Sequence, residues 1–332
     1  MIKDKRVQAA LISCFISVLV LSLKLFAFFR TQSTAILSDA LETIVNVIAA
    51  ITALFVIRII VKPADDDHPY GHGKAEYFSA AFEGGLVLSA GLYIIYDGVQ
   101  SFFAPREFQD LLIGVFYISI ASVINLIVGL YLLRIGNRSH SIAIRASGIH
   151  LMSDVKTTAG VIVGVALVAW TGYKQIDSIV ALFVGLHLLV EGYQVVRESI
   201  AGLTDEIEPS SLGLLSECFE ACRSEGIIDI HEVRAIRSGR FHHIDAHVVV
   251  PEYWNVKDAH EILNQFEKRV VEKYSFDGEI AFHQDPCLQK YCSSCDVSSC
   301  PIRLKPLEKR REFTFITIQQ SVPEDRLYSD AP

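Results

Sequence analysis

The segment AILSDALETIVNVIAAITALFVIRIIV, residues 35–61, is a long apolar run that carries only a few polar side chains. A helix needs about 20 residues to cross the hydrocarbon core of a bilayer, and this run is long enough. It is one of six such runs, which predict six transmembrane helices within residues 1–206. The other five runs lie at about residues 8–29, 79–103, 111–134, 143–170 and 176–200.

The composition agrees with a chain that is only partly in lipid. It has 332 residues, of which 51% are hydrophobic and 20% are charged, and this mixture predicts one lipid-soluble part and one water-soluble part. The formal net charge of −8 argues against a nucleic-acid partner and is compatible with handling cations. The first apolar run is too long for the apolar region of a signal peptide, so we expect it to be the first transmembrane helix.

Lysine and arginine are unevenly distributed between the connections of the six predicted helices. With the N-terminus inside, the cytoplasmic segments hold ten basic residues and the opposite side holds three. This asymmetry predicts a multi-pass protein of the cell (inner) membrane with both termini in the cytoplasm. The ten are Lys3, Lys5, Arg6, Arg58, Lys62, Lys74, Arg134, Arg138, Arg145 and Arg197, against Arg30, Arg106 and Lys174.

After about residue 206 the hydrophobic periodicity becomes that of a water-soluble domain. An amphipathic helix (SSLGLLSECFEACRSE), two alternating strands (HEVRAIRSG and FHHIDAHVVVP), a second helix and a last strand (GEIAFHQDP) follow in order. This αββαβ order predicts a ferredoxin-like, metallochaperone-like α+β domain with a three-stranded sheet over residues 207–290. Residues 287–332 form a cysteine-rich segment and a tail, in which EFTFITIQQ is either a late strand or an ordered appendage.

Two predicted transmembrane helices carry polar side chains at helical spacing. Asp39, Glu42 and Asn46 are three and four residues apart, and so are on one face of the second helix, while His150 and Asp154 are one turn apart on the fifth. Ionisable groups at membrane depth cost several kcal/mol unless they are paired or face a wet cavity. We therefore expect an ion path there; the alternative is a hydrogen-bonded clamp between the two helices.

These features together resemble the cation diffusion facilitator family of metal transporters. The resemblance rests on the six helices, the two polar pairs, the segment DDDHPYGHGKAE (residues 65–76) and the αββαβ domain ending in HQDP. It implies a homodimer that exports a divalent transition metal from the cytoplasm in exchange for protons, by alternating access. The matching positions of the transport site are Glu42, Asn46, His150 and Asp154.

The transport-site positions depart from the family pattern in one respect. Zinc carriers of the family generally have Asp or His followed by Asp on the second helix, whereas this chain has Glu42 followed by Asn46. The set is richer in oxygen and therefore harder, so Fe(II), Mn(II) and Co(II) compete with Zn, which accepts four N/O ligands. We hypothesise broad or iron- and manganese-leaning selectivity. Asp39 is an accessory ligand, a proton relay or a packing hydrogen bond.

The resemblance also implies sites outside the membrane. Asp65, His68 and His72 match a second, cytoplasmic-loop metal site, for which the alternative is a solvated acidic loop. Lys74 and Asp205 match a charge pair near the membrane face of the dimer. A regulatory binuclear metal site that bridges the dimer is implied at His231, His247, His260, His283 and Asp285, where the alternative is a set of core histidines. Strand alternation places His243, Asp245 and His247 on one face and His242 on the other.

Four cysteines follow the last predicted strand in a Cys-x4-Cys-x2-Cys-x4-Cys run. Four thiolates at such spacing suit Zn or an iron–sulfur cluster, and the reducing cytoplasm disfavours disulfides. The alternative is free structural thiols. The four are Cys287, Cys292, Cys295 and Cys300.

Two other classes of function stay open. A membrane-bound metal sensor that does not transport would explain the cytoplasmic ligands, but it has no need of ligands inside the membrane. A passive channel would have a polar stripe along several helices. We find no G-x-x-x-x-G-K-[ST] motif for an ATP-driven pump, so we expect no enzyme, with membrane lipids around the protein and protons as the counter-ion.

Overall fold

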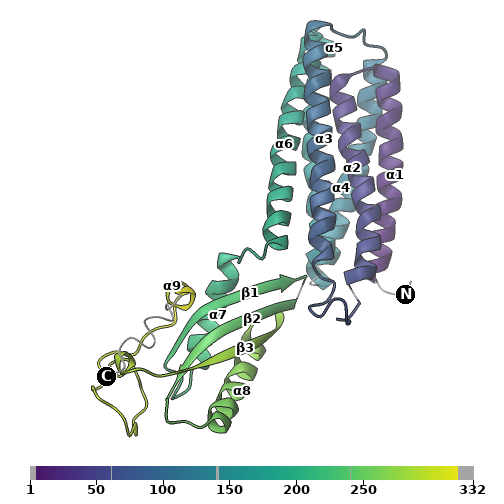
Figure 1. Cartoon of the computed structure of the whole chain (residues 1–332). Coiled ribbons are helices and arrows are strands. Elements are labelled where there is room, and N and C mark those ends of the chain that lie inside the picture. The colour runs from purple at the N-terminus through teal and green to yellow at the C-terminus, as the bar shows by residue number, and fades with distance from the viewer. Residues whose placement is uncertain (1–4, 61, 140–141, 240, 321–332) are drawn as a thin grey trace. The chain divides into compact units, whose positions relative to one another are not determined.

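Six long helices form the N-terminal part of the computed structural model (Figure 1), which describes residues 5–60, 62–139, 142–239 and 241–320. Side chains are described from residue 15 onward, except at 50, 53, 54, 57, 58, 61, 136–147, 149, 240 and 321–332. The basic residues at positions 3, 5, 6, 58, 138 and 145 that predict orientation lie outside the described side chains. The helices are α1 (Lys5–Thr31), α2 (Thr34–Ile60), α3 (Ala75–Phe103), α4 (Leu111–Ser139), α5 (Ile142–Thr171) and α6 (Gln175–Leu203).

The chain divides into two compact units, one of residues 1–59 with 75–200 and one of residues 60–74 with 201–332. The first is the helical unit and the second contains the sheet. In the described part of the helical unit, four stretches are long and apolar enough to cross a membrane. They are Ala75–Phe103, Leu111–Ile135, His150–Thr171 and Gln175–Leu203.

The outer surface of the helical unit is apolar. Large side chains such as Phe103, Leu112 and Trp170 are 80% exposed or more, which would expel the unit from water and suits contact with lipid tails. The six predicted helices are confirmed, because each predicted apolar run lies on one long helix.

Small residues let α3 and α6 approach each other closely. A Cβ atom at Gly84 would lie 2.8 Å from Val196 Cγ2, and one at Gly192 would lie 2.9 Å from the Leu88 backbone nitrogen. Glycine at such positions is typical of close helix packing in membranes. The contact fixes the neighbouring residues Glu83 and Glu191 on the same pair of helices.

The second unit has the predicted αββαβ order. Its sheet is ordered β1-β2-β3, with β2 antiparallel to β1 and parallel to β3. Phe219 of the first helix and Phe266 of the second pack with Ile244 and Val248 on one sheet face, which buries the alternate apolar positions that predicted the strands. The elements are α7 (Pro209–Cys222), β1 (Asp229–Ser238), β2 (Phe241–Val250), α8 (Val256–Lys273) and β3 (Asp277–Pro286).

Residues 287–320, which follow β3, form an ordered appendage. They contain a 3-10 turn, η1 (Gln289–Tyr291), and a short helix, α9 (Phe315–Gln319). The stretch EFTFITIQQ therefore forms a helix rather than the late strand that was one of its two predicted conformations. Phe313 and Ile318 join the core of the second unit, so the appendage packs on this unit.

Candidate metal sites

The predicted transport residues of α2 and α5 face each other inside the helical unit. Asn46 Nδ2 donates a hydrogen bond of 2.9 Å to Asp154 Oδ2, and His150 Nε2 lies 3.9 Å from Asp154 Oδ1. Glu42 is 6% exposed and Asp154 2%. Helical spacing alone brings His150 and Asp154 together, whereas Asn46 meets Asp154 only because the two helices pack side by side.

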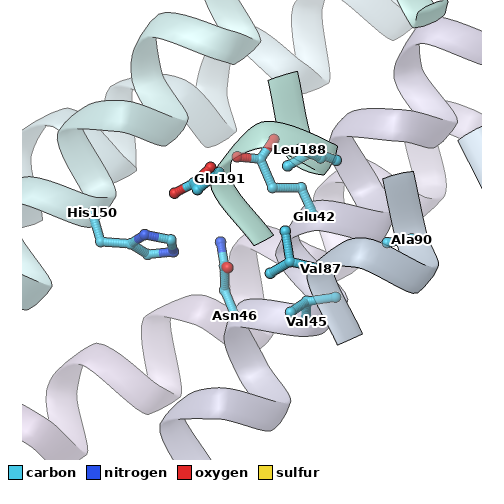
Figure 2. A pocket seen from close by; sticks show the side chains of 8 residues that line it. All are labelled: Glu42, Val45, Asn46, Val87, Ala90, His150, Leu188 and Glu191. Atoms are coloured by element: carbon cyan, nitrogen blue, oxygen red, sulfur yellow. The ribbon is translucent and has the colours of Figure 1, made fainter. Parts of the chain in front are cut away.

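A small cavity lies beside these residues (Figure 2). It has a volume of about 10 Å³, close to the smallest that holds one water molecule. Figure 2 shows the Asn46 amide and the His150 ring directed into the space that the Glu42 and Glu191 carboxylates border. Its lining residues are Glu42, Val45, Asn46, Val87, Ala90, His150, Leu188 and Glu191.

Several buried atoms here lack a hydrogen-bond partner. They include Glu42 Oε2, His150 Nε2 and Asp154 Oδ1. An unpaired buried polar atom costs about 1–3 kcal/mol, so such atoms mark the place of a missing partner. Two of the three are carboxylate oxygens, which accept and do not donate; a cation would satisfy them together.

Asp39 forms an ion pair with a buried lysine. Lys24 Nζ lies 2.9 Å from Asp39 Oδ1, and Thr158 Oγ1 donates to the same oxygen over 2.6 Å. Lys24 is 1% exposed and was not anticipated from the sequence, although a lone lysine within the first apolar run was a visible signal. Asp39 is thus a member of a buried ion pair that ties α1, α2 and α5 together.

The loop residues Asp65, His68 and His72 form a compact group, with ligand atoms all within 4.8 Å of one another. His68 Nδ1 is 3.0 Å from Asp65 Oδ1, and His72 Nε2 is 3.4 Å from Asp65 Oδ2. The hydrogen bond with the His68 side chain lowers the pKa of Asp65. An imidazole pair with a carboxylate at this spacing is a ligand set that suits a transition metal.

The second unit holds this loop in place. Ser238 Oγ at the end of β1 donates to the Tyr70 carbonyl over 3.0 Å, and the Tyr70 ring meets the His243 ring at a centroid distance of 4.9 Å. Lys74 Nζ lies 2.8 Å from Asp205 Oδ1, so the predicted charge pair forms within one chain. The loop group therefore belongs structurally to the sheet-containing unit.

A second compact group lies on the sheet face opposite α7 and α8. His231, His247 and Asp285 place one ligand atom each within 4.8 Å; Asp285 Oδ2 is 3.0 Å from His247 Nδ1 and 3.4 Å from His231 Nε2. Burial acts to raise the pKa of Asp285, but hydrogen bonds with His231 and His247 outweigh it and the pKa is lowered. His283 Nε2 lies 3.9 Å from the other oxygen, Oδ1.

The fifth predicted member of this group lies elsewhere. His260 is exposed on α8, the helix that packs on the other face of the sheet, so one chain does not bring it to the group. Instead, the structure adds Glu232, whose Oε2 lies 3.9 Å from His247 Nε2. Glu232 has φ 50° at an irregularity in the β1–β2 pairing, and strand alternation could not anticipate its direction.

Comparison with known proteins decides the family. Residues 10–204 match the model of the cation efflux transmembrane domain, and residues 215–287 match that of the cation efflux protein cytoplasmic domain. The chain belongs to the cation efflux family. It is therefore a multi-pass membrane protein with a helical transmembrane domain and a cytoplasmic domain that carries a small mixed sheet, in a family of transporters rather than enzymes.

Two relatives illustrate how far the likeness extends. An uncharacterized transporter of Synechocystis sp. is 36% identical over 278 residues, which cover 83% of this chain and 89% of the relative. The cation-efflux pump FieF of Yersinia pestis (strain Pestoides F) is 30% identical over 281 residues, which cover 84% and 92%. The matched regions therefore extend over both domains of this cation efflux protein.

The four cysteines that follow β3 in the Cys-x4-Cys-x2-Cys-x4-Cys run line one cavity of about 530 Å³. Cys295 is buried in an apolar cluster with Tyr291 and Val297, against which Cys287 and Cys300 pack. Burial raises the pKa of the Cys287 and Cys295 thiols. Among the described residues, the two groups with ligand atoms within 4.8 Å contain no cysteine, so Zn or an iron–sulfur cluster on these thiols stays a prediction.

Two further carboxylates of this cation efflux protein lie at the membrane site and were missed from the sequence. Glu191 on α6 lines the cavity. Glu83 on α3 lies within electrostatic range of both His150 and Glu191. A signal was available for Glu191, because His187 and Glu191 have the same i, i+4 spacing as His150 and Asp154. Glu83 has no such partner in the sequence.

Proposed function

We propose that this protein exports a divalent transition metal from the cytoplasm in exchange for protons. The observation that carries the proposal is the pair of buried carboxylates, Glu42 and Asp154, each with an unpartnered oxygen. They lie on two membrane helices beside the small cavity that Glu42, Asn46 and His150 line. A sensor would have no use for cation ligands at that depth.

The ligand set favours Fe(II), Mn(II) and Co(II) alongside Zn. Glu42, Asn46 and Asp154 offer oxygen atoms and His150 offers one nitrogen, and oxygen-rich sets suit harder cations. Asn46 donates its amide hydrogen to Asp154, which leaves its own oxygen free for a metal ion. The cation-efflux pump of Yersinia pestis is a relative whose name is consistent with such export.

Proton exchange follows from competition at one site. The His150 imidazole must be neutral to bind a metal ion, and a bound metal ion disfavours protonation of its ligands. Protons arriving from the outer side would therefore release the metal ion, and metal arriving from the cytoplasm would release protons. Alternating exposure of the site to the two sides of the inner membrane completes the cycle.

We infer that the transporter works as a homodimer regulated by cytoplasmic metal. The match to the cation efflux cytoplasmic domain supports dimerisation, and the group of His231, His247 and Asp285 supports a resident ion there. Asp285 turns one oxygen to His247 and the other to His283, an arrangement suited to bridging two ions. His260 would then act across the dimer, because it is remote from the group within one chain.

Transport by the purified protein in proteoliposomes tests the proposal. Uptake of Zn²⁺, Fe²⁺, Mn²⁺ and Co²⁺ is measured under an imposed pH gradient for the wild type, for Asp154→Ala and for Lys156→Ala, an exposed position on the same helix. Gradient-driven uptake that only Asp154→Ala loses supports antiport. Tight metal binding without uptake of any metal would favour a membrane-bound sensor, for which the cytoplasmic group is the supporting observation.

A further inference from the structure

We propose that Glu191 of α6 is a further ligand of the transported ion, so that the transport site draws on three helices rather than two. The inference rests on the proposed function. It starts from the cavity, which Glu191 lines together with Glu42, Asn46 and His150. In Figure 2 the Glu191 carboxylate lies between the His150 ring and Glu42.

The surroundings of Glu191 require a polar or cationic partner. It lies in an apolar helix that is long enough to span a membrane, where an unpaired carboxylate is costly. His187 Nε2 is 3.9 Å from Glu191 Oε2, which is beyond hydrogen-bond distance. The side chain is 32% exposed, so the carboxylate is neither buried in a closed ion pair nor released into lipid.

The cavity offers the partner that Glu191 lacks. Glu42 is 6% exposed and lines the cavity with Oε2 unpartnered, and His150 Nε2 is likewise buried and unpartnered. A divalent cation placed between these groups would satisfy all three side chains. A hydrogen bond could satisfy at most one of the two carboxylates, because His150 Nε2 can donate a single N–H and ionised carboxylates only accept.

The charges of the site give Glu191 a specific role. Asn46 is neutral, and Lys24 neutralises Asp39 through their ion pair, which leaves Glu42 and Asp154 as the anionic ligands of the predicted set. Glu191 restores the third carboxylate that Asn46 does not provide. A third anionic oxygen strengthens binding of hard cations most, so we expect Mn²⁺ to depend on Glu191 more than Zn²⁺ does.

The close packing of α3 and α6 holds this residue in place. Gly192, the next residue along α6, is buried with its backbone against Gly84 of α3, which fixes the position of the Glu191 backbone relative to α3. A ligand on α6 also gives the bound ion a contact with the α3–α6 pair, in addition to α2 and α5.

Proteoliposome uptake of Mn²⁺ and Zn²⁺ compares the wild type with Glu191→Gln, Glu191→Asp and the double variant Asn46→Asp/Glu191→Gln. Glu191→Gln should raise KM for Mn²⁺ about 10-fold or more, and KM for Zn²⁺ less. Glu191→Asp keeps the charge, so its KM for Mn²⁺ should lie between those of the wild type and Glu191→Gln. The double variant should recover much of the Mn²⁺ affinity, because it returns a carboxylate to the cavity. Glu198→Gln, an exposed position on α6, is the control.

Wild-type KM values for both metals in Glu191→Gln and Glu191→Asp would overturn the inference, as would a loss that the double variant does not reverse. If the wild type transports no metal, the proposed function fails separately. The role of Glu191 is then tested by equilibrium binding of Mn²⁺ to the full chain carrying His72→Ala and His247→Ala. These two substitutions disable the loop group and the sheet group outside the membrane. Weaker binding on adding Glu191→Gln supports the role, and unchanged binding refutes it.

Discussion

Lys24 Nζ lies 2.9 Å from Asp39 Oδ1 inside the helical unit, and the two side chains are 1% and 0% exposed. The pair joins α1 to α2, and Thr158 of α5 donates to the same Asp39 oxygen. A buried pair of this kind adds little net stability over an apolar pair of similar volume, but each partner becomes a buried unpaired charge when the other is removed. A single substitution in this ion pair should therefore cost more stability than substitution of both partners.

Replacing one member of this pair should destabilise the helical unit. We expect Lys24→Met to cost about 3–5 kcal/mol in the free energy of unfolding, because it leaves the Asp39 charge unpaired. The double variant Lys24→Met/Asp39→Asn should recover most of this loss. Thermal unfolding of the detergent-solubilised chain measures both, and purely additive losses in the double variant would contradict the prediction.

Gly73 should control the packing of the loop that carries Asp65, His68 and His72 on the cytoplasmic domain. A Cβ atom there would lie 2.3 Å from the Ser238 carbonyl carbon, so Gly73→Ala must push the loop away from β1. Overpacking of this kind costs about 1–3 kcal/mol, and displacement should weaken Zn²⁺ binding by Asp65, His68 and His72. Isothermal titration against the wild type measures the change.

The matched control for Gly73→Ala is Gly213→Ala. Gly213 lies on α7 of the same unit and has open space around its Cβ position. That substitution should leave Zn²⁺ binding unchanged and stabilise the helix by about 0.5–1 kcal/mol. Equal Zn²⁺ affinity in the two variants would show that the loop group does not depend on contact with the sheet.

His242 should make the stability of the cytoplasmic domain fall in mild acid. Burial lowers its pKa below the usual 6.5, and its Nδ1 is 2.8 Å from the Tyr274 hydroxyl. The unfolded chain therefore takes up this proton at higher pH than the folded chain does. The contribution of His242 is complete above about pH 6.5 and is lost as the pH falls below that value, by at most about 1.4 kcal/mol per pH unit.

Denaturant unfolding tests this dependence between about pH 5 and 8, the range in which histidine changes charge. His242→Gln should flatten the profile below pH 6.5. His243→Gln is the control, because His243 lies on the opposite sheet face. Its Nδ1 is hydrogen-bonded to Glu279 Oε1 over 2.8 Å. A profile that stays equally steep without His242 would assign the acid sensitivity to another group.

Asp285 should be required for metal to stabilise the cytoplasmic domain. A ligand at 100 times its Kd stabilises a folded protein by about 2.7 kcal/mol. We therefore expect Zn²⁺ to raise the Tm at which the cytoplasmic domain unfolds in the wild-type full chain. Asp285→Asn removes the charge that both His231 and His247 face, so the shift should largely disappear. Asp245→Asn, an exposed position of β2, should keep it; loss of the shift in both variants would point to nonspecific binding.

Features that depend on neighbours in the sequence could be predicted. The length of the apolar runs determined the six helices, and alternation determined the αββαβ domain, because local hydrophobic period reports secondary structure. Helical spacing likewise placed His150 beside Asp154. His242 was expected on the opposite strand face from His247, and it is buried against Tyr274 as that alternation requires.

Only the tertiary structure decided which of these groups meet. Lys24 reaches Asp39 and Thr158 because α1, α2 and α5 pack together, and Glu191 reaches the cavity because α3 and α6 approach closely at glycines. These residues lie far apart in the chain, and no local period relates them. Glu232 joins its group through an irregular backbone conformation, whereas His260 is kept from it by the sheet itself. Sequence by itself therefore determined the types of the candidate ligand residues and the helices or strands that carry them, because both depend on local pattern. Packing decided which of these residues meet and which charges are paired.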